Sequence, residues 1–579
     1  MPDRNYWQRI RNGRLSRRNL LQASGRAGLG AAGIALVGCG DDDDDSQQSA
    51  AQVQQQQQQQ AQAADQPQAQ QQQQAAAQQQ AAAQQATVSE ERPRGGTLRA
   101  GWAGSSPATH QAPYGATPET IFYPALWDTL TKYSPTGLDP QPHLAESWEF
   151  NDDQTMIQIH LRPGLEFHDG KPMTAEEIKK SLERMDDEDV QNSQVRSIYN
   201  KYVSKATAID KTTLQLDLAW PGTVIFDVLN WAQIHDADNI AELDGYTRVN
   251  ASGPFKFDVD AYQVDVFARA ERFENFYDPA SLDAIEWNIF QDAESMTLAL
   301  QNGELDITHH LPKAWYKGFD EDDNFDLLLA PPTGSIWVLG MVGEGRGGGH
   351  PMMDNPTARQ AIYRTIDRER IVAELFEGLS ETKNVLWPSF SPAYDADADY
   401  QYFDLDEAKR LITEAGYPDG TPTIKIACFG NNEEALSIAQ VIQQDAAQAG
   451  INLEPESVEA AAWIDRFLSG THPGAYLSFY GFYAMHPQSL PVMNYQMRIP
   501  NSCAYETPHY QAMIDGWATA DTDQKRQALI DDFNQILDEE PWVSPICTTV
   551  QIWAHTNKVK NLYYDVMSIP RLHHIYMET

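Results

Sequence analysis

The stretch "TMIQIHLRPGLEFHDGKPMTAEEIKKSLERM", Thr155 to Met185, decides the fold. Its first residues alternate between apolar and polar side chains, which predicts a half-buried strand. The pair Asp169-Gly170 predicts a turn. Thr174, with Glu177 three residues later, forms a capping box that opens a helix running to the end of the stretch.

Two other segments have equally plain local signals. Apolar residues recur at helical spacing from Phe122 to Leu130, and they predict a helix that ends near Ser134-Pro135, because proline disfavours helix in the residue before it. Far downstream, Asp404 is placed to cap another helix, and Gly416 suits a left-handed helix stop.

Several short motifs follow one another in an order and at spacings that are specific when taken together. They are LAESW at 144–148, LRPG at 161–164, FHDGKP at 167–172, SGPFKF at 252–257, NGELDI at 302–307, NPTARQAIYRTIDRERIVAELFEG at 355–378 and FDLDEAKRLITEAGYPDG at 403–420. With these motifs the chain resembles the bacterial extracellular solute-binding proteins of family 5, the dipeptide/oligopeptide-binding class of ABC importers. The resemblance runs from Gly95 to the C-terminal end.

The resemblance implies a two-lobed α/β fold of the periplasmic-binding-protein-like kind (type II, large peptide-binder class), with mixed sheets and a ligand cleft between the lobes. We expect the first lobe at 95–344, with a family-type subdomain at about 135–247, the second lobe at 345–545, and a return to the first lobe at 546–579. The Gly-rich stretch 343–351 fits either a pliable crossing between lobes or an inserted surface loop.

The N-terminal segment has the features of an export signal. Arg17 and Arg18 precede a short Gly/Ala-rich apolar run that is too short for a comfortable membrane span. The paired arginines resemble the twin-arginine signal of proteins exported in the folded state, and the residues that end at Cys39 resemble a lipobox. We expect residues 1–38 to be a signal peptide and Cys39 to carry lipid, with an ordinary signal peptide and an incidental cysteine as the alternative.

Residues 39–92 contain five aspartates and then a tract of glutamine and alanine. Such a tract cannot bury enough apolar surface to fold, so we expect a disordered stalk. Residues 41–579 carry 35 basic and 81 acidic side chains, a net charge of −46. This charge argues strongly against nucleic acid as a partner, because phosphate binding needs dense positive charge. It favours solubility in water, with a cation-binding surface as the alternative.

Beyond Cys39 the chain has three cysteines, Cys428, Cys503 and Cys547. They cannot all pair within one chain, and no CxxC or Cys/His spacing indicates a metal site. One disulfide is permitted outside the cell, and the sequence does not select its partners.

The resemblance also bears on the ligand. In the family's peptide binders, a second-lobe carboxylate within a stretch like GW-x-x-D-x-x-x-P receives the free amino group of the peptide. The corresponding segment here is FYGFYAMHPQSL at 479–490, where Pro487 as the anchor puts Tyr483 at the aspartate position. No acidic residue lies between Arg466 and Glu506. The usual anchor for a free peptide N-terminus is therefore missing or supplied from elsewhere.

Aromatic residues take the place of the acid. Aromatic faces with hydroxyl tips suit sugar rings, aromatic compounds or cations, and Trp463 matches a helix-start tryptophan that often lines the family's cleft. We predict that the following side chains contact ligand, with core packing as the alternative for each: Trp102, Trp231, Trp337, Trp463, Tyr480, Phe482, Tyr483 and His486.

Other functions have weaker support. There is no GxSxG, HExxH or SxxK motif, so we expect no catalytic residue and no enzyme. A secreted hydrolase is the alternative, in which two carboxylates would meet across a cleft as in glycosidases. Nickel could use His309, His310 or His486, but adjacent histidines on a strand or helix point in different directions, and we expect no metal and no cofactor.

The sequence therefore predicts a monomeric lipoprotein, exported by the twin-arginine route and held by lipid alone on the outer side of the cytoplasmic membrane. It would capture a peptide-like or other small organic solute and deliver it to an ABC permease. ATP hydrolysis would belong to partner ATPase subunits, because no GxxxxGK[ST] loop occurs. The alternatives are a binder of a non-peptide solute (an oligosaccharide, an aromatic compound or a cation) and a ligand sensor of the same fold.

Overall fold

The structure, a computed structural model, describes residues 93–104, 122–186, 194–243, 247–308, 310–329, 335–399, 402–430, 432–481, 485–566 and 569–578. These residues belong to one compact unit, Ser89–Thr579. The expected signal peptide with Arg17 and Arg18, the lipidation site Cys39 and nearly all of the stalk lie outside the described residues. No described helix is both long enough and apolar enough to cross a membrane.

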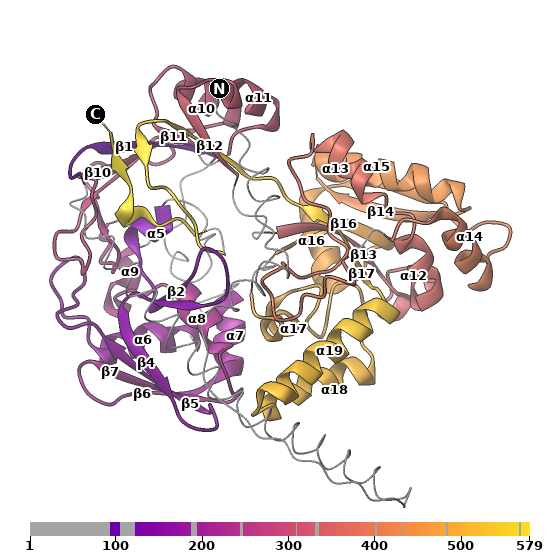
Figure 1. Cartoon of the computed structure of the whole chain (residues 1–579), viewed down its shortest axis with the longest axis horizontal. Helices are drawn as coiled ribbons and strands as arrows, with labels where there is room; N and C mark the ends of the chain where they lie inside the picture. Colours follow the sequence, from indigo (N-terminus) through magenta and orange to yellow (C-terminus); the bar gives the residue numbers. More distant parts are fainter. Residues whose placement is uncertain are drawn as a thin grey trace, which may run out of the picture. The chain divides into compact units, whose positions relative to one another are not determined.

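A seven-stranded mixed sheet contains the first and the last large strands of the described region (Figure 1). Its central strand β1 runs parallel to β10 and β11, and the other neighbouring pairs are antiparallel. In spatial order the strands are β12 (Phe325–Leu329), β18 (Ile552–Thr556), β11 (Ile307–Thr308), β1 (Thr97–Ala103), β10 (Ala284–Phe290), β9 (Phe267–Arg272) and β8 (Phe255–Phe257). Helix α5 (Phe122–Leu126) packs into the core of this sheet, and α10 (Ala293–Gln301) and α11 (Tyr316–Asp320) form a smaller cluster beside it.

The helix predicted from Phe122 onward is shorter than expected. It ends at Leu126, and β2 (Thr131–Tyr133) follows, paired with β3 (Pro140–Pro142). Groups distant in sequence bind this segment: the backbone N–H of Asp128 donates to the Ser252 hydroxyl, 2.9 Å away, and the N–H of Tyr133 donates to the Asn230 side chain over 2.6 Å. These tertiary hydrogen bonds replace the ones that a longer helix would have made within itself.

An antiparallel four-stranded sheet confirms the local predictions for the opening stretch. Its order is β4 (Ala145–Phe150), β5 (Met156–Leu161), β7 (Thr213–Leu218) and β6 (Val203–Ala208), and α6 (Ala175–Glu183), α7 (Gln194–Tyr202) and α8 (Ile225–Trp231) accompany it. Ile157 and Ile159 are buried, as the alternation predicts. The Thr174 hydroxyl accepts a hydrogen bond from the N–H of Glu177, so the predicted cap forms.

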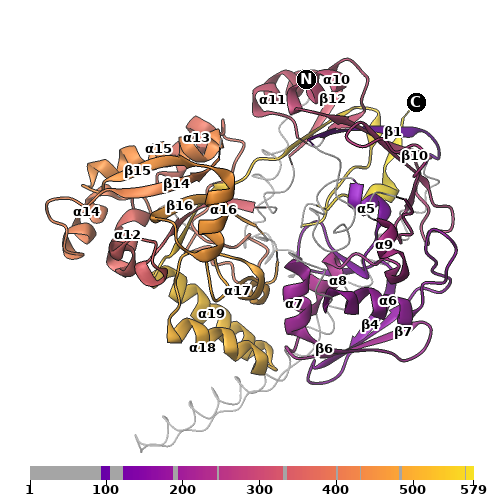
Figure 2. The same cartoon turned by 180° about the vertical axis from the view of Figure 1, so that it is seen from behind.

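A five-stranded mixed sheet forms the third large part. Its order is β15 (Leu453–Val458), β14 (Ile424–Phe429), β16 (Gly474–Gly481), β13 (Ser335–Met341) and β17 (Val543–Thr548). Figure 1 shows α12 (Pro356–Tyr363), α13 (Arg368–Leu375), α14 (Leu405–Glu414) and α15 (Glu433–Gln448) grouped around it. Figure 2 shows α16 (Ala460–Ser469) from behind, with α17 (Leu490–Met493), α18 (Pro508–Gly516) and α19 (Asp523–Glu539). Asp404 caps α14, and Gly416 has the predicted positive φ, +101°.

Three further small elements are α9 (Ile240–Leu243) and the paired strands β19 (Val559–Lys560) and β20 (Tyr576–Met577). We call the part built on the seven- and four-stranded sheets the first lobe, and the part built on the five-stranded sheet the second lobe. The chain passes from the first to the second between β12 and β13, and returns between β17 and β18.

This path differs from the expected lobe boundary. β13 pairs with β16 and β17, so residues 335–344, which we expected in the first lobe, lie with the second. The Gly-rich stretch 343–351 therefore follows the crossing. Close packing explains two of its glycines: a Cβ atom on Gly349 would fall 2.0 Å from the carbonyl oxygen of Gly343, and one on Gly348 would fall 2.3 Å from that of Thr471.

Candidate functional site

The two lobes meet at a buried carboxylate, Asp227 in α8. This carboxylate accepts hydrogen bonds from the Tyr133 hydroxyl (2.6 Å), the backbone N–H of His486 (3.1 Å) and the Ser489 hydroxyl. The Tyr202 hydroxyl in turn donates to the Ser489 oxygen over 2.9 Å. Tyr133, Tyr202 and Asp227 belong to the first lobe, and His486 and Ser489 to the second. We call these five residues the seam.

Asp227 lies at the seam without a cationic partner among the described residues that bond to it. Its side chain is 1% exposed. Burial raises the pKa of Asp227 to about 6, and the hydrogen bonds from Ser489, Tyr133 and His486 offset only part of that effect. A carboxylate that already accepts three hydrogen bonds has little capacity left for a ligand's ammonium group.

A narrow pocket lies on the first-lobe side of the same helix. Its volume, about 10 Å³, is roughly the room that one water molecule needs. The lining residues are Pro124, Trp127, Thr129, Lys132, Asn230, Trp231, Gln233 and Ile569.

Three buried atoms of this lining have no hydrogen-bond partner in the described part of the chain: Trp127 Nε1, Asn230 Nδ2 and Gln233 Oε1. Two of them are N–H donors and one is an amide oxygen acceptor. An uncharged polar group such as an amide or a hydroxyl matches this set. Leaving buried polar atoms unpaired costs about 1–3 kcal/mol each, so the pocket favours an occupant of this chemistry.

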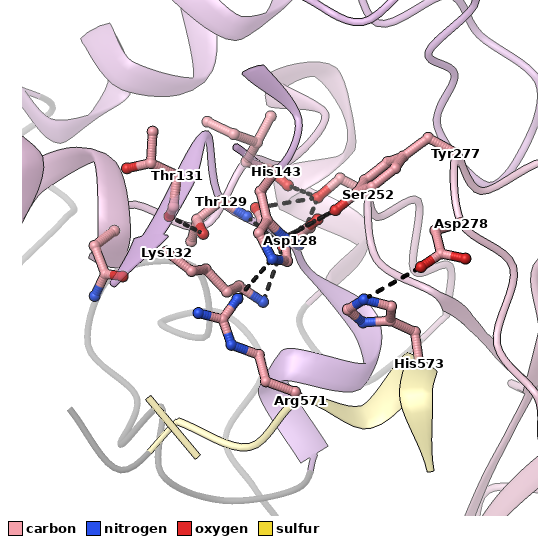
Figure 3. A network of polar contacts seen from close by, with 12 residues as sticks. Asp128, Thr129, Thr131, Lys132, His143, Ser252, Tyr277, Asp278, Arg571 and His573 are labelled. Atoms are coloured by element: carbon pink, nitrogen blue, oxygen red, sulfur yellow. Dashed lines mark hydrogen bonds and ion pairs between the residues drawn. The ribbon is translucent and has the colours of Figure 1, made fainter. Parts of the chain in front are cut away.

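A network of charged and polar side chains includes Lys132, which lines the pocket (Figure 3). The Lys132 ammonium lies 3.0 Å from the Asp128 carboxylate, and His143 Nδ1 lies equally close to it. Arg571 donates to His143 Nε2 over 2.6 Å. Because Nε2 accepts from Arg571, Nδ1 carries the proton and donates to Asp128. Burial lowers the pKa of His143 to about 3, so this imidazole is neutral near pH 7.

The predicted ligand residues of the first lobe divide between two environments. Trp231 is 8% exposed and lines the pocket. Trp102 is half-buried near the end of β1. Trp337, which we expected on this side, is carried by β13 in the second lobe, and it is buried in that lobe's core with its ring centroid 5.9 Å from Phe479.

The predicted residues of the second lobe are mostly buried. Trp463 in α16 stacks on Phe467, with ring centroids 4.9 Å apart, and donates from Nε1 to the carbonyl oxygen of Ala427 over 3.1 Å. Tyr480 is fully buried. The pleat of β16 turns neighbouring side chains to opposite faces, so Phe479 is 55% exposed while Tyr480 packs inward. Phe482 and Tyr483 lie outside the described residues.

His486 takes part in the seam through its backbone. Its Nδ1 accepts a hydrogen bond from the N–H of Gln488 and so caps the following turn. Burial lowers the pKa of His486 to about 4, so the ring is neutral near pH 7. The two described groups of side chains arranged for a metal ion include neither His310 nor His486, and His309 lies outside the described residues.

Two other features bear on the sequence predictions. Cys428, Cys503 and Cys547 are each buried and free, so these three form no disulfide with one another. A second cavity of about 360 Å³ lies in the second lobe between α12 and α19, and none of the predicted ligand residues lines it.

The site residues that sequence reasoning missed are Asp227, Trp127, Asn230 and Gln233. One signal was present: Asp227 stands within the apolar run VIFDVLNWA, and a charged residue in such a run is rarely buried without a specific partner. The three pocket residues have no motif, because their proximity depends on how α5 and α8 pack.

The described architecture is that of a two-lobed α/β binding protein. The sequence profile of the bacterial extracellular solute-binding proteins, family 5 (middle part), matches residues 139–499. Because the match covers more than half of the chain, the chain belongs to this family. The glutathione-binding protein GsiB of Shigella flexneri serotype 5b is 27% identical over 273 residues, which cover 45% of this chain and 51% of that protein. The chain thus spans about half the length of the curated relatives it matches.

Solved structures share the fold. The binding protein DppA of Helicobacter pylori, in complex with the peptide STSA, has a TM-score of 0.69 at 21% identity, covering 85% of this chain and 100% of that one. AgaA of A. tumefaciens R10, in complex with agropinic acid, has a TM-score of 0.67 at 22% identity, covering 84% and 99%. The same fold therefore occurs in a protein bound to the peptide STSA and in one bound to agropinic acid.

Proposed function

We propose that this chain is the extracytoplasmic substrate-binding component of an ABC importer. It holds a peptide-like or other small organic solute between its lobes and presents it to a permease, while ATPase subunits hydrolyse ATP. Family membership supports this role. The single observation that carries it is the seam, where first-lobe and second-lobe groups share one buried carboxylate. No covalent chemistry is part of the proposal.

The mechanism follows from differential binding. A solute that touches both lobes favours the arrangement in which they meet, by its difference in affinity for the two arrangements. In that arrangement the Asp227 carboxylate is buried away from water. Its hydrogen bonds to water are replaced by those from the Tyr133 and Ser489 hydroxyls and the backbone N–H of His486. The permease then recognises the liganded arrangement.

A non-peptide solute is the second candidate, and two observations favour it. The sequence has no acid between Arg466 and Glu506, and the Asp227 carboxylate, which bonds to His486 and Ser489 in this segment, already accepts hydrogen bonds from three donors.

Export and anchoring belong to the same proposal. Arg17 and Arg18 direct export by the twin-arginine route, and lipid on Cys39 holds the protein at the outer side of the cytoplasmic membrane, as a monomer. Metabolic labelling with a radioactive fatty acid tests the anchor: wild type should be labelled and pelleted with membranes, and Cys39→Ser should be neither. Equal labelling of the two would contradict the anchor and leave solute binding untouched.

A thermal-shift screen of the full chain tests the binding function. The probes are di- to pentapeptides, oligosaccharides, betaines and polyamines, aromatic acids and nickel complexes. A probe at a hundredfold its Kd stabilises the native state by about 2.7 kcal/mol. Stabilisation by at least one class of organic solute is the expected result, and stabilisation by uncharged polar compounds but not by peptides would favour the non-peptide candidate. Stabilisation by peptides alone would overturn the non-peptide candidate, and no stabilisation by any class would overturn the binding role.

The exposed ring of Phe479 provides the site-directed test. Phe479→Ala should weaken the active probe about two- to tenfold, the value of one aromatic contact. Leu298→Ala is the control, because Leu298 on α10 is similarly exposed, 46% against 55%. Equal affinities for wild type and Phe479→Ala would remove the aromatic segment from the site.

A further inference from the structure

Two neighbouring histidines near the C-terminal end converge on one carboxylate. His573 and His574 lie in a short 3-10 turn, and Asp278 lies between β9 and β10. His574 Nε2 is 3.1 Å from Asp278 Oδ2, and His573 Nε2 is 3.7 Å from the same oxygen. One ligating atom from each of the three lies within 4.8 Å of the other two. Figure 3 shows the His573 ring directed toward Asp278.

The two separations from Asp278 are close to those between neighbouring ligands of a tetrahedral metal ion. Zinc binds histidine nitrogen at about 2.0–2.1 Å and carboxylate oxygen at about 2.0–2.2 Å, so neighbouring ligands in a tetrahedron lie roughly 3.4 Å apart. The two distances, 3.1 and 3.7 Å, lie on either side of that value. Small side-chain movements would therefore bring all three atoms to bonding distance of one ion.

The turn explains why adjacent histidines face the same way here. The two imidazole centroids are only 4.0 Å apart, which neither a strand nor a regular helix allows for neighbouring side chains. The Tyr563 hydroxyl lies 2.7 Å from His574 Nδ1 and fixes that ring with Nε2 toward the carboxylate, as outer partners of metal ligands do. His573 is buried, while the Asp278 side chain is 34% exposed, so an ion can enter from solvent.

We propose that Asp278, His573 and His574 bind one divalent transition-metal ion, Zn²⁺ first among them, with water at the open position. Two imidazoles and one carboxylate suit zinc, cobalt or nickel and disfavour the oxygen-seeking Mg²⁺ and Ca²⁺. The ion joins the C-terminal segment to the loop before β10, where the N–H of Ser281 already donates to the carbonyl oxygen of His573. The site is independent of the proposed solute-binding function.

Metal titration of the full chain tests the proposal. After chelation and dialysis, Zn²⁺ is titrated in excess Mg²⁺, which occupies weak carboxylate sites on the acidic surface, and Co²⁺ is used as a spectroscopic probe. We expect one Zn²⁺ per chain, tetrahedral Co²⁺ absorption, and a thermal midpoint that rises with Zn²⁺. His573→Gln, His574→Gln and Asp278→Asn should each weaken binding about tenfold or more.

His509→Gln is the matched control. His509 Nε2 lies 2.9 Å from Asp532 Oδ1, which is an equivalent histidine–aspartate pair without a second histidine, and the variant should bind zinc as wild type does. Equal weakening by His509→Gln and His574→Gln, or no zinc binding in excess Mg²⁺, would reduce the group to an ion pair and overturn the proposal. If a histidine variant fails to fold, the zinc affinity of Asp278→Asn provides the same test.

Discussion

Two buried aspartates of the first lobe are stabilised in opposite ways. Asp128 faces the Lys132 ammonium and the His143 N–H, each 3.0 Å away, whereas Asp227 faces only hydroxyls and one backbone N–H. Each is 1% exposed. Burial would raise the pKa of Asp128, but His143 and Lys132 outweigh it and hold the pKa well below its usual range. No cation offsets the effect of burial on Asp227, and the pKa of its carboxyl rises to about 6.

The difference separates a fixed structural centre from a contact between lobes. An ion pair inside one lobe stays desolvated whatever the other lobe does, so its charges can be matched permanently. Under the proposed function, the Asp227 carboxylate would lose its water only in the arrangement in which the lobes meet. The bound solute would then offset the free-energy cost of burying this carboxylate.

The largest expected effect comes from removing the cation beside Asp128. Lys132→Met should destabilise the protein by about 3–5 kcal/mol, because it leaves a buried carboxylate without its ion partner. The measurement is the shift in thermal and urea unfolding against wild type. Lys180→Met is the control: its ion pair with Glu177 has a similar length, 2.9 Å, but the lysine is 41% exposed, and the cost should be below about 1 kcal/mol. Equal costs would remove the distinction between the two aspartates.

The next effect is a pH dependence that belongs to Asp227. Between about pH 4 and pH 6 the native carboxyl keeps a proton that the unfolded chain has released. The stability due to this proton is complete below about pH 4 and is lost as the pH rises through 6, by roughly 3 kcal/mol. The difference in thermal midpoint between wild type and Asp227→Asn should therefore change across this window.

The control for this profile is Asp531→Asn on α19, where the carboxyl is exposed. Its melting profile should run parallel to that of wild type from pH 4 to pH 7. A parallel profile for Asp227→Asn as well would mean that the seam carboxylate is not protonated in the native state.

The smallest effect concerns the hydroxyl shared by the two lobes. Ser489→Ala removes a donor to Asp227 and an acceptor for Tyr202, and should cost about 1–3 kcal/mol because buried partners are left unpaired. Ser204→Ala removes an exposed serine that donates to the carbonyl oxygen of Asp217, and it should change stability by less than about 0.5 kcal/mol. Urea unfolding measures the free energy of unfolding of both variants. Similar decreases for Ser489→Ala and Ser204→Ala would mean that the hydrogen bonds of the seam stabilise the protein no more than an exposed one does.

Local chemistry made part of the fold predictable. Thr174 and Asp404 form their caps and Gly416 takes the left-handed conformation, because each depends on residues within one turn. The motif order from LAESW onward gave the family for a similar reason: its members share short backbone features that neighbouring residues enforce.

The candidate site was less predictable. Trp463 and Tyr480 were expected beside ligand and lie in packed cores, since an aromatic side chain serves either purpose and burial depends on what packs above it. The chain leaves the helix after Leu126, and Asp128 and Tyr133 donate backbone hydrogen bonds to Ser252 and Asn230, partners that no local sequence pattern reveals.

The sequence by itself determined the family, the mixed α/β composition, the helix caps and the acidic surface, since these follow from composition and from contacts a few residues apart. Only the tertiary structure decided that Asp227 faces Ser489, that Trp127, Asn230 and Gln233 line one pocket, and that Asp278 meets His573 and His574. Each of these groups joins residues that are about a hundred or more positions apart along the chain. Their distances depend on strand register and on the packing of many side chains at once, which no short stretch of sequence encodes.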